Sequence, residues 1–154
     1  MSCTAIMTKE PVTISGDMTV AHATAMLIEM HSASLPVVDA DGCYIGMFAI
    51  TDLLGLLLPR VALAGDLKSN LRFLSDDPGE LRRRYEELQS RSVSEVADRN
   101  GARLDPDAPE IAAIRLCFRG QASVPVVETG TDKLIGIISC WDAMRALTGA
   151  PHRA

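Results

Sequence analysis

Two aspartates, Asp52 and Asp142, close two similar stretches of the chain, SLPVVDADGCYIGMFAITDLL and SVPVVETGTDKLIGIISCWDAM. An ionised carboxylate accepts charge-assisted hydrogen bonds, so each aspartate could bind the hydroxyl groups of a small ligand. Ser139 precedes Asp142 by three residues and adds a hydroxyl, whereas the corresponding residue of the first stretch is Ala49. Each aspartate could instead cap the N-terminus of the helix that follows, which is worth about 1 kcal/mol. Both interpretations remain open at this point.

The other reactive side chains form no catalytic or metal-binding pattern. The chain has three histidines, His22, His31 and His152, and none is paired convincingly with a nucleophile. The cysteines are scattered singly, without a C-x-x-C pattern or a histidine at ligand spacing: Cys3, Cys43, Cys117 and Cys140. We therefore expect no enzyme, no metal site, no cofactor and no disulfide, and we expect the thiols to be reduced.

Composition narrows the class of protein further. The 154 residues are 47% hydrophobic, enough to bury a core in one compact domain or in two small domains that share it. The formal net charge of −5 disfavours nucleic acid and anionic membranes, because both require clustered lysine and arginine. The N-terminus lacks the pattern of a signal peptide, and the run LLGLLLPRVALAG is broken at Pro59 and Arg60. These features predict a cytoplasmic protein.

The two similar stretches predict the same order of elements. In each copy an apolar run, a turn and a second apolar run predict a pair of strands: 35–38 and 44–50, then 124–127 and 134–139. A helix follows each pair, and we expect Asp52 and Asp142 at the N-caps of these helices.

An amphipathic helix is predicted before each pair of strands. Its apolar residues recur at spacings of three and four and are expected to face the core: Val20, Ala23, Leu27 and Met30, then Ile111, Ile114 and Phe118. The first helix is entered through Asp17 and Thr19, and the second follows Pro109. A short extended segment precedes each helix, at 11–14 and at 102–104.

Each copy is therefore a β-α-β-β-α unit, which is too small to cover both faces of its own sheet. We expect an α+β fold in which the two repeats, 1–58 and 92–150, pack about an approximate two-fold axis with clefts between them. Residues 59–91 are expected to form a helical insert, and 151–154 a tail. In the insert, Asp77 and Pro78 precede an amphipathic helix whose dense charge indicates a solvated face or a docking surface for a partner.

The chain resembles a tandem pair of CBS domains, often called a Bateman module. AIMTKEPVTI, SLPVVDADG and IGMFAITDLL carry the resemblance, with EVADRNGARL, SVPVVETGTDK and IGIISCWDAM in the second copy. The resemblance covers nearly the whole chain apart from 55–91 and the tail. It implies a regulatory module that binds an adenosine-containing ligand, such as AMP, ADP, ATP or S-adenosylmethionine, between the repeats.

The resemblance also implies which residues line the two clefts. An aspartate would accept hydrogen bonds from both ribose hydroxyls, and a serine three residues earlier would add to them. One cleft would hold Asp142, Ser139, Ile137, Met7, Val12, Ala33 and Ser34. The other would hold Asp52, Met47, Ala97, Ala102, Ala122 and Ser123. We expect the Asp142 cleft to bind more strongly, because Ala49 replaces the hydroxyl in the other cleft.

The ligand's phosphates lack an obvious partner in this sequence. Relatives often carry arginine or histidine just before the x-P pair, where this chain has Ala33-Ser34 and Ala122-Ser123. Cations would have to come from elsewhere, with these candidates: Lys9, His31, Arg119 and Lys133. Two functions stay open, a sensor of an adenosine-type ligand that modulates a partner protein and a purely structural interaction module. The apolar segment LLGLLL favours a homodimer in either case.

Overall fold

The computed structural model describes residues 1–59 and 78–151. The first repeat contains a short 3-10 helix, η1 (Cys3–Ala5), and two helices, α1 (Val20–Met30) and α2 (Ile50–Leu57). Its strands are β1 (Thr8–Lys9), β2 (Ile14–Ser15), β3 (Ser34–Val38) and β4 (Tyr44–Ala49). Helix α5 (Gly79–Leu88) precedes the second repeat, which contains α6 (Val93–Val96), α7 (Glu110–Phe118), β5 (Ser123–Val127), β6 (Leu134–Ser139) and α8 (Cys140–Thr148).

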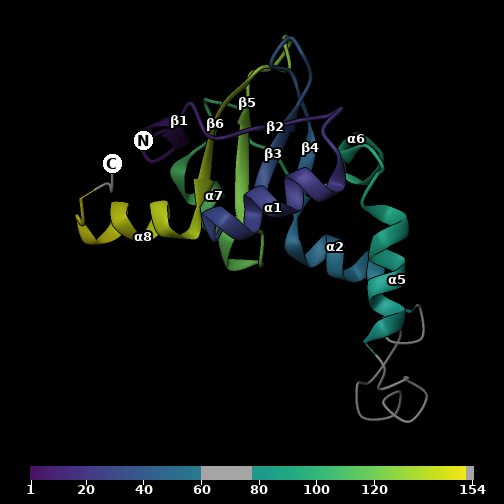
Figure 1. The fold of residues 1–154 in the computed structure, drawn as a ribbon. Coiled ribbons are helices and arrows are strands. Elements are labelled where there is room, and N and C mark those ends of the chain that lie inside the picture. The colour runs from purple at the N-terminus through teal and green to yellow at the C-terminus, as the bar shows by residue number, and fades with distance from the viewer. Residues whose placement is uncertain (60–77, 152–154) are drawn as a thin grey trace.

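Two three-stranded sheets meet at the centre of the molecule, with the strand orders β2-β3-β4 and β1-β6-β5. Strands β3 and β5 lie next to each other, and α2 and α8 leave the same end of the sheets in opposite directions (Figure 1). In each repeat the two main strands pair antiparallel, with Pro36 opposite Met47 and Pro125 opposite Ile137. The expected α+β pair of repeats is confirmed.

Each repeat completes the sheet of the other. Strand β1, from the first repeat, pairs antiparallel with β6 of the second, where Thr8 lies opposite Ile137. In return, Asp98 of the second repeat forms a two-way backbone bridge with Met47 of β4, at 2.9 Å and 2.8 Å. The two repeats are thus joined by backbone hydrogen bonds as well as by side-chain packing.

These exchanges require glycine at two equivalent positions. A Cβ atom on Gly46 would lie 2.5 Å from the carbonyl oxygen of Asp98. A Cβ atom on Gly136 would lie 2.8 Å from the carbonyl oxygen of Thr8 and 2.6 Å from Sδ of Met7. Because real Cβ contacts are longer, the glycine of each repeat admits the segment that arrives from the other.

The apolar faces of α1 and α7 differ in burial. Thr19 caps α1 by accepting a hydrogen bond from the backbone N–H of His22, and Val20, Ala23 and Leu27 are buried as predicted. Met30 is exposed. The prediction for α7 is wrong at two positions, since Ile111 is 67% and Phe118 88% exposed. The residues that turn inward are Ala113, Leu116 and Cys117.

Helix α5 lies against the first repeat (Figure 1). Tyr85 and Leu88 pack against the core around Phe48, and Nη1 of Arg84 donates to the carbonyl oxygen of Leu57 at 3.3 Å. Arg84 also pairs with Glu80 at 3.1 Å, as the spacing of four predicts. Asp77, which the sequence places just before this helix, lies outside the described residues. None of the described helices combines the length and the apolar character needed to cross a membrane.

Candidate ligand-binding site

A cavity of about 540 Å³ opens between the two repeats, and we call it the Asp52 cleft. Its walls come from the loops before β3 and β5, from the start of α2 and from the segment after α6. The lining residues are His31, Ser32, Ala33, Ser34, Met47, Ala49, Ile50, Thr51, Asp52, Asp98, Gly101, Gly120, Gln121, Ala122 and Ser123. Its size is within the range of small-molecule sites.

Asp52 lies in the first turn of α2, whose N-cap is Ala49. The expectation that Asp52 is itself the N-cap is therefore wrong, because β4 runs directly into the helix and ends at Ala49. The Asp52 side chain is exposed to the cleft and makes no hydrogen bond or ion pair with any residue that the structure describes. Burial and the nearby charge of Asp98 raise the pKa of its carboxyl group above the ordinary value. An unpaired carboxylate at a cleft wall is free to accept a ligand's hydroxyl groups.

Ser34 adds a second unpaired polar group to the cleft. Its side chain is only 4% exposed, and its hydroxyl has no hydrogen-bond partner in the described part of the chain. An unsatisfied buried hydroxyl is costly for a folded protein. Ser34 lines the cavity, and rotation of its side chain would bring the hydroxyl to a bound molecule.

Asp98 is a cleft residue that the sequence analysis missed. The backbone bridge to Met47 holds it against the first repeat, and its Oδ1 accepts a hydrogen bond from the N–H of Asn100 at 2.9 Å. Burial raises the pKa of the neighbouring Tyr44 hydroxyl to about 12, and the negative charge of Asp98 contributes to this rise. Only the pairing between repeats places Asp98 here, so its type and spacing in the sequence carried no signal.

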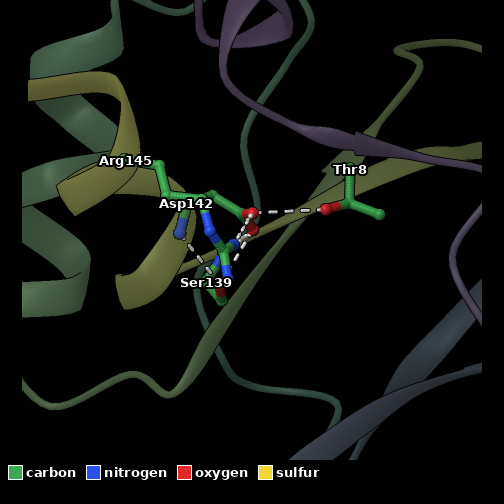
Figure 2. A network of polar contacts seen from close by, with 4 residues as sticks. All are labelled: Thr8, Ser139, Asp142 and Arg145. Atoms are coloured by element: carbon green, nitrogen blue, oxygen red, sulfur yellow. Dashed lines mark hydrogen bonds and ion pairs between the residues drawn. The ribbon is translucent and has the colours of Figure 1, made fainter. Parts of the chain in front are cut away.

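Asp142 is placed differently from Asp52, and Figure 2 shows it among Ser139, Thr8 and Arg145. Ser139 is the N-cap of α8 and Asp142 its third residue, so the expectation of Asp142 at the N-cap is also wrong. The two form a capping box: Ser139 donates to Oδ2 from N and from Oγ, both at 2.8 Å, and Oγ accepts from the N–H of Asp142. Oδ1 accepts from Thr8 and from Arg145, each at 3.3 Å.

The Asp142 carboxylate is 4% exposed, and the protein itself satisfies it. A ligand hydroxyl would have to compete with the capping box, with Thr8 and with Arg145. Asp142 and Ser139 are thus held together as the sequence predicts, yet in the structure they stabilise the start of α8 and its contact with β1. Ile137 and Met7 lie beside them, in β6 and next to Gly136.

The structure places some of the remaining predicted site residues in the expected cleft and others elsewhere. Met47, Ala122 and Ser123 line the Asp52 cleft as expected. Ala33 and Ser34, which were assigned to the Asp142 cleft, line the Asp52 cleft instead, because the loops before β3 and β5 converge there. Val12 is exposed, and Ala97 packs against the first core.

A second cavity, of about 550 Å³, lies along α7, and we call it the arginine groove. Its lining is Ala102, Arg103, Leu104, Ile111, Ala112, Arg115, Leu116 and Arg119. Ala102, predicted for the Asp52 cleft, is found here. Gln121 lines the Asp52 cleft and donates from Nε2 to the carbonyl oxygen of Ala102 at 2.7 Å, so this hydrogen bond lies between the two cavities.

Neither metal ligation nor thiol chemistry is indicated by the described residues. Across 1–59 and 78–151, no three histidine, cysteine, aspartate or glutamate side chains are grouped to hold a metal ion. All four cysteines are free. Burial, together with the adjacent thiol of Cys140, raises the pKa of Cys117 to about 12, so this thiol stays protonated at neutral pH.

The fold and the cleft define a class of protein: two pseudo-symmetric β-α-β-β-α repeats that exchange edge segments and leave an open cavity between them. The chain belongs to the CBS domain family, whose family model, described as CBS domain, matches residues 3–59 and 93–149. The two matches correspond to the two repeats.

Solved structures of CBS-pair proteins share the fold. CBSX2 in complex with AMP is 21% identical, with 96% of each chain covered and a TM-score of 0.70. The CBS domain pair of MJ0100, in complex with 5′-methylthioadenosine and S-adenosyl-L-methionine, is 20% identical over 96% of this chain and 99% of that chain, with a TM-score of 0.62. CbpB in complex with c-di-AMP is 13% identical over 97% and 85%, with a TM-score of 0.67. Comparison with curated proteins by sequence found no match.

Proposed function

We propose that this chain is a regulatory module that binds an adenosine-containing ligand in the Asp52 cleft and modulates a partner protein. The observation that carries the proposal is that Asp52 and Ser34 line one open cavity while the Asp52 carboxylate and the buried Ser34 hydroxyl have no partner among the described residues. A ribose presents two neighbouring hydroxyls, which Asp52 can accept together. Met47 and Ile50 supply apolar wall for a base.

The relatives support this class of ligand. CBSX2, MJ0100 and CbpB were solved with AMP, with 5′-methylthioadenosine and S-adenosyl-L-methionine, and with c-di-AMP, and all of these contain adenosine. The cleft of the present chain lies between its repeats, where a ligand touches both. Binding there can change the angle between the halves, which is how a partner would sense it.

The alternative is a ligand-free structural module. The closed network around Asp142 favours it, because that aspartate already has the role of a helix-capping and repeat-joining residue. The Asp52 cleft distinguishes the two functions, since a purely structural role does not require an open cavity whose wall carries a carboxylate without a partner among the described residues.

A ligand panel tests the proposal. Thermal unfolding is measured with adenosine, 5′-methylthioadenosine, S-adenosylmethionine, AMP, ADP, ATP and c-di-AMP. A ligand that binds only the folded chain adds about 2.7 kcal/mol of stability at a hundred times its dissociation constant. Asp52→Ala should reduce the shift to about half or less, and Asp107→Ala, at an exposed position outside the cleft, should retain it. If no compound shifts the transition, the structural module is the correct reading.

We also propose a homodimer formed through the helices that leave the sheets. On α2, Leu54 and Leu56 are 53% and 52% exposed, and α8 exposes Trp141, Met144 and Leu147. Helix α5 donates a hydrogen bond to the carbonyl oxygen of Leu57, and the side chains named above stay exposed. Both helices lie at the same end of the sheets (Figure 1), so a two-fold copy could bury both at once.

A further inference from the structure

The charges that face the Asp52 cleft are unusual for a site that would hold a nucleotide. Among its described lining residues the ionisable groups are Asp52, Asp98 and His31, and no lysine or arginine is among them. A phosphate brought into this cleft would meet two carboxylates. Like charges repel more strongly at a partly buried site than in water.

Asp98 cannot easily move away from the cleft. Its backbone exchanges two hydrogen bonds with Met47, and its carbonyl oxygen occupies the space that a side chain on Gly46 would need. Its carboxylate also accepts the N–H of Asn100. The negative charge is therefore fixed in the wall, and its repulsion acts on Asp52 as well as on any ligand.

The arginines that flank the cleft segments in the sequence have partners elsewhere or line another cavity. Arg99, which follows Asp98, donates to the carbonyl oxygen of Ser94 at 2.8 Å. Arg103 pairs with Asp132 at 3.5 Å. Arg115 and Arg119 line the arginine groove, and the hydrogen bond between Gln121 and Ala102 lies between that groove and the cleft. The two carboxylates of the cleft thus have no guanidinium among the residues that line it with them.

We propose that Asp98 is a specificity-determining residue, and that the Asp52 cleft selects adenosine compounds whose 5′ substituent is neutral or positively charged over those that carry phosphate. This inference rests on the proposed function, since it assumes that the cleft binds an adenosine moiety. A sulfonium group relieves the repulsion between the two carboxylates, a thioether leaves it unchanged, and each phosphate adds to it. Specificity of this kind comes from a repulsive contact as much as from an attractive one.

Isothermal titration calorimetry on the full chain at pH 8 tests the order of affinities. The probes are adenosine, 5′-methylthioadenosine, S-adenosylmethionine, AMP and ATP. S-adenosylmethionine should bind tightest and ATP weakest, separated by at least about tenfold. Asp98→Asn should narrow this ratio by about fivefold or more, because it weakens the binding of the cation and strengthens the binding of AMP. The matched control is Asp107→Asn, an exposed aspartate outside the cleft, which should leave the ratio as it is.

The salt dependence of the unaltered protein provides a test that needs no variant. Added sodium chloride should weaken the binding of S-adenosylmethionine and strengthen the binding of AMP. Screening removes an attraction in the first case and a repulsion in the second. If ATP binds tightest and weakens steeply with salt, the specificity proposal is overturned, while the proposed function stands. Loss of that ATP binding in Arg115→Gln and Arg119→Gln would then place the phosphates in the arginine groove. If none of the five probes binds, adenosine included, the proposed function fails and this inference fails with it.

Discussion

Thr8 donates a hydrogen bond from its Oγ1 to Oδ1 of Asp142 at 3.3 Å, and this bond links the first strand of the chain to its last helix (Figure 2). Asp142 also completes the capping box of α8 with Ser139. One buried carboxylate therefore holds a helix terminus and a contact between the two repeats.

Replacing Asp142 should cost stability whether or not a ligand is present. Asp142→Ala removes the capping box and leaves the Thr8 hydroxyl without its acceptor, so we expect a loss of about 2 kcal/mol in the free energy of unfolding. Urea denaturation of the ligand-free protein measures it. Thr8→Val, which removes only the bond between repeats, should lose about half as much. An unchanged midpoint in Asp142→Ala would show that the network does not stabilise the fold.

The two aspartates should respond oppositely in binding experiments. Asp52→Ala should weaken adenosine by about 1.5–3 kcal/mol, the scale of hydrogen bonds to a charged group. Asp142→Ala should weaken the binding of adenosine far less, once the lower stability of this variant is taken into account. Calorimetry at a temperature where both variants are folded makes the comparison. The sequence alone favours the reverse order, and a result in that order would return the principal site to Asp142.

Ser34→Ala separates binding from folding. The hydroxyl is buried and unpaired, so its removal should leave the ligand-free protein equally stable or make it more stable, by up to about 1 kcal/mol. Adenosine affinity should fall about fivefold, because a hydrogen bond that forms only in the complex is lost. Ser92→Ala is the control: Ser92 donates to the carbonyl oxygen of Gly16 away from the cleft, so that variant should lose stability and keep its affinity. A destabilised Ser34→Ala would mean that the hydroxyl has a partner.

The raised pKa of Asp52 predicts how stability changes with pH. Because the native state holds this proton to higher pH than the unfolded chain, whose carboxyl has the ordinary value of 3.8, its contribution to stability falls as pH rises through the raised pKa. Asp52→Asn removes the ionised group, so the variant should be more stable than the parent at pH 7. The gain should shrink as pH is lowered toward 4, as urea denaturation at the two pH values would show. A gain that grows on acidification contradicts the assignment.

The exposed leucines of α2 predict self-association. Light scattering at micromolar concentration should give about twice the chain mass of 16.5 kDa. Leu54→Glu and Leu56→Glu together should give the monomer, since burying two carboxylates in an apolar interface is unfavourable. Asp41→Glu, far from the helices, serves as the control. A parent protein that remains a monomer with and without ligand would rule out this assembly.

Local patterns in the sequence predicted most of the elements. The apolar runs around Pro36 and Pro125 became β3 and β5, and Thr19 became the cap of α1. These two strands and this cap depend on residues within a few positions of each other in the sequence, so a local pattern is enough to predict them. The repetition of one phrase also predicted a pair of packed repeats, because one copy cannot cover its own sheet.

Helix α7 shows where periodicity failed. Its sequence EIAAIRLCF is apolar over most of its circumference, so more than one stripe fits the core equally well. The predicted stripe included Phe118, but in the structure Phe118 is exposed. Ala113 and Leu116 face the core instead. Only the shape of the neighbouring sheet and of η1 decides which stripe is buried.

The sequence by itself determined that the chain would form two β-α-β-β-α repeats, each with an aspartate near the start of its last helix. It could not determine which aspartate is free. Strand β1 crosses to the second repeat and brings Thr8 to Asp142, while the bridge at Met47 brings Asp98 to the side of Asp52. These pairings join residues far apart in the chain, and their energies depend on packing across both repeats rather than on local pattern. Tertiary structure therefore satisfied one carboxylate and left the other open to a ligand.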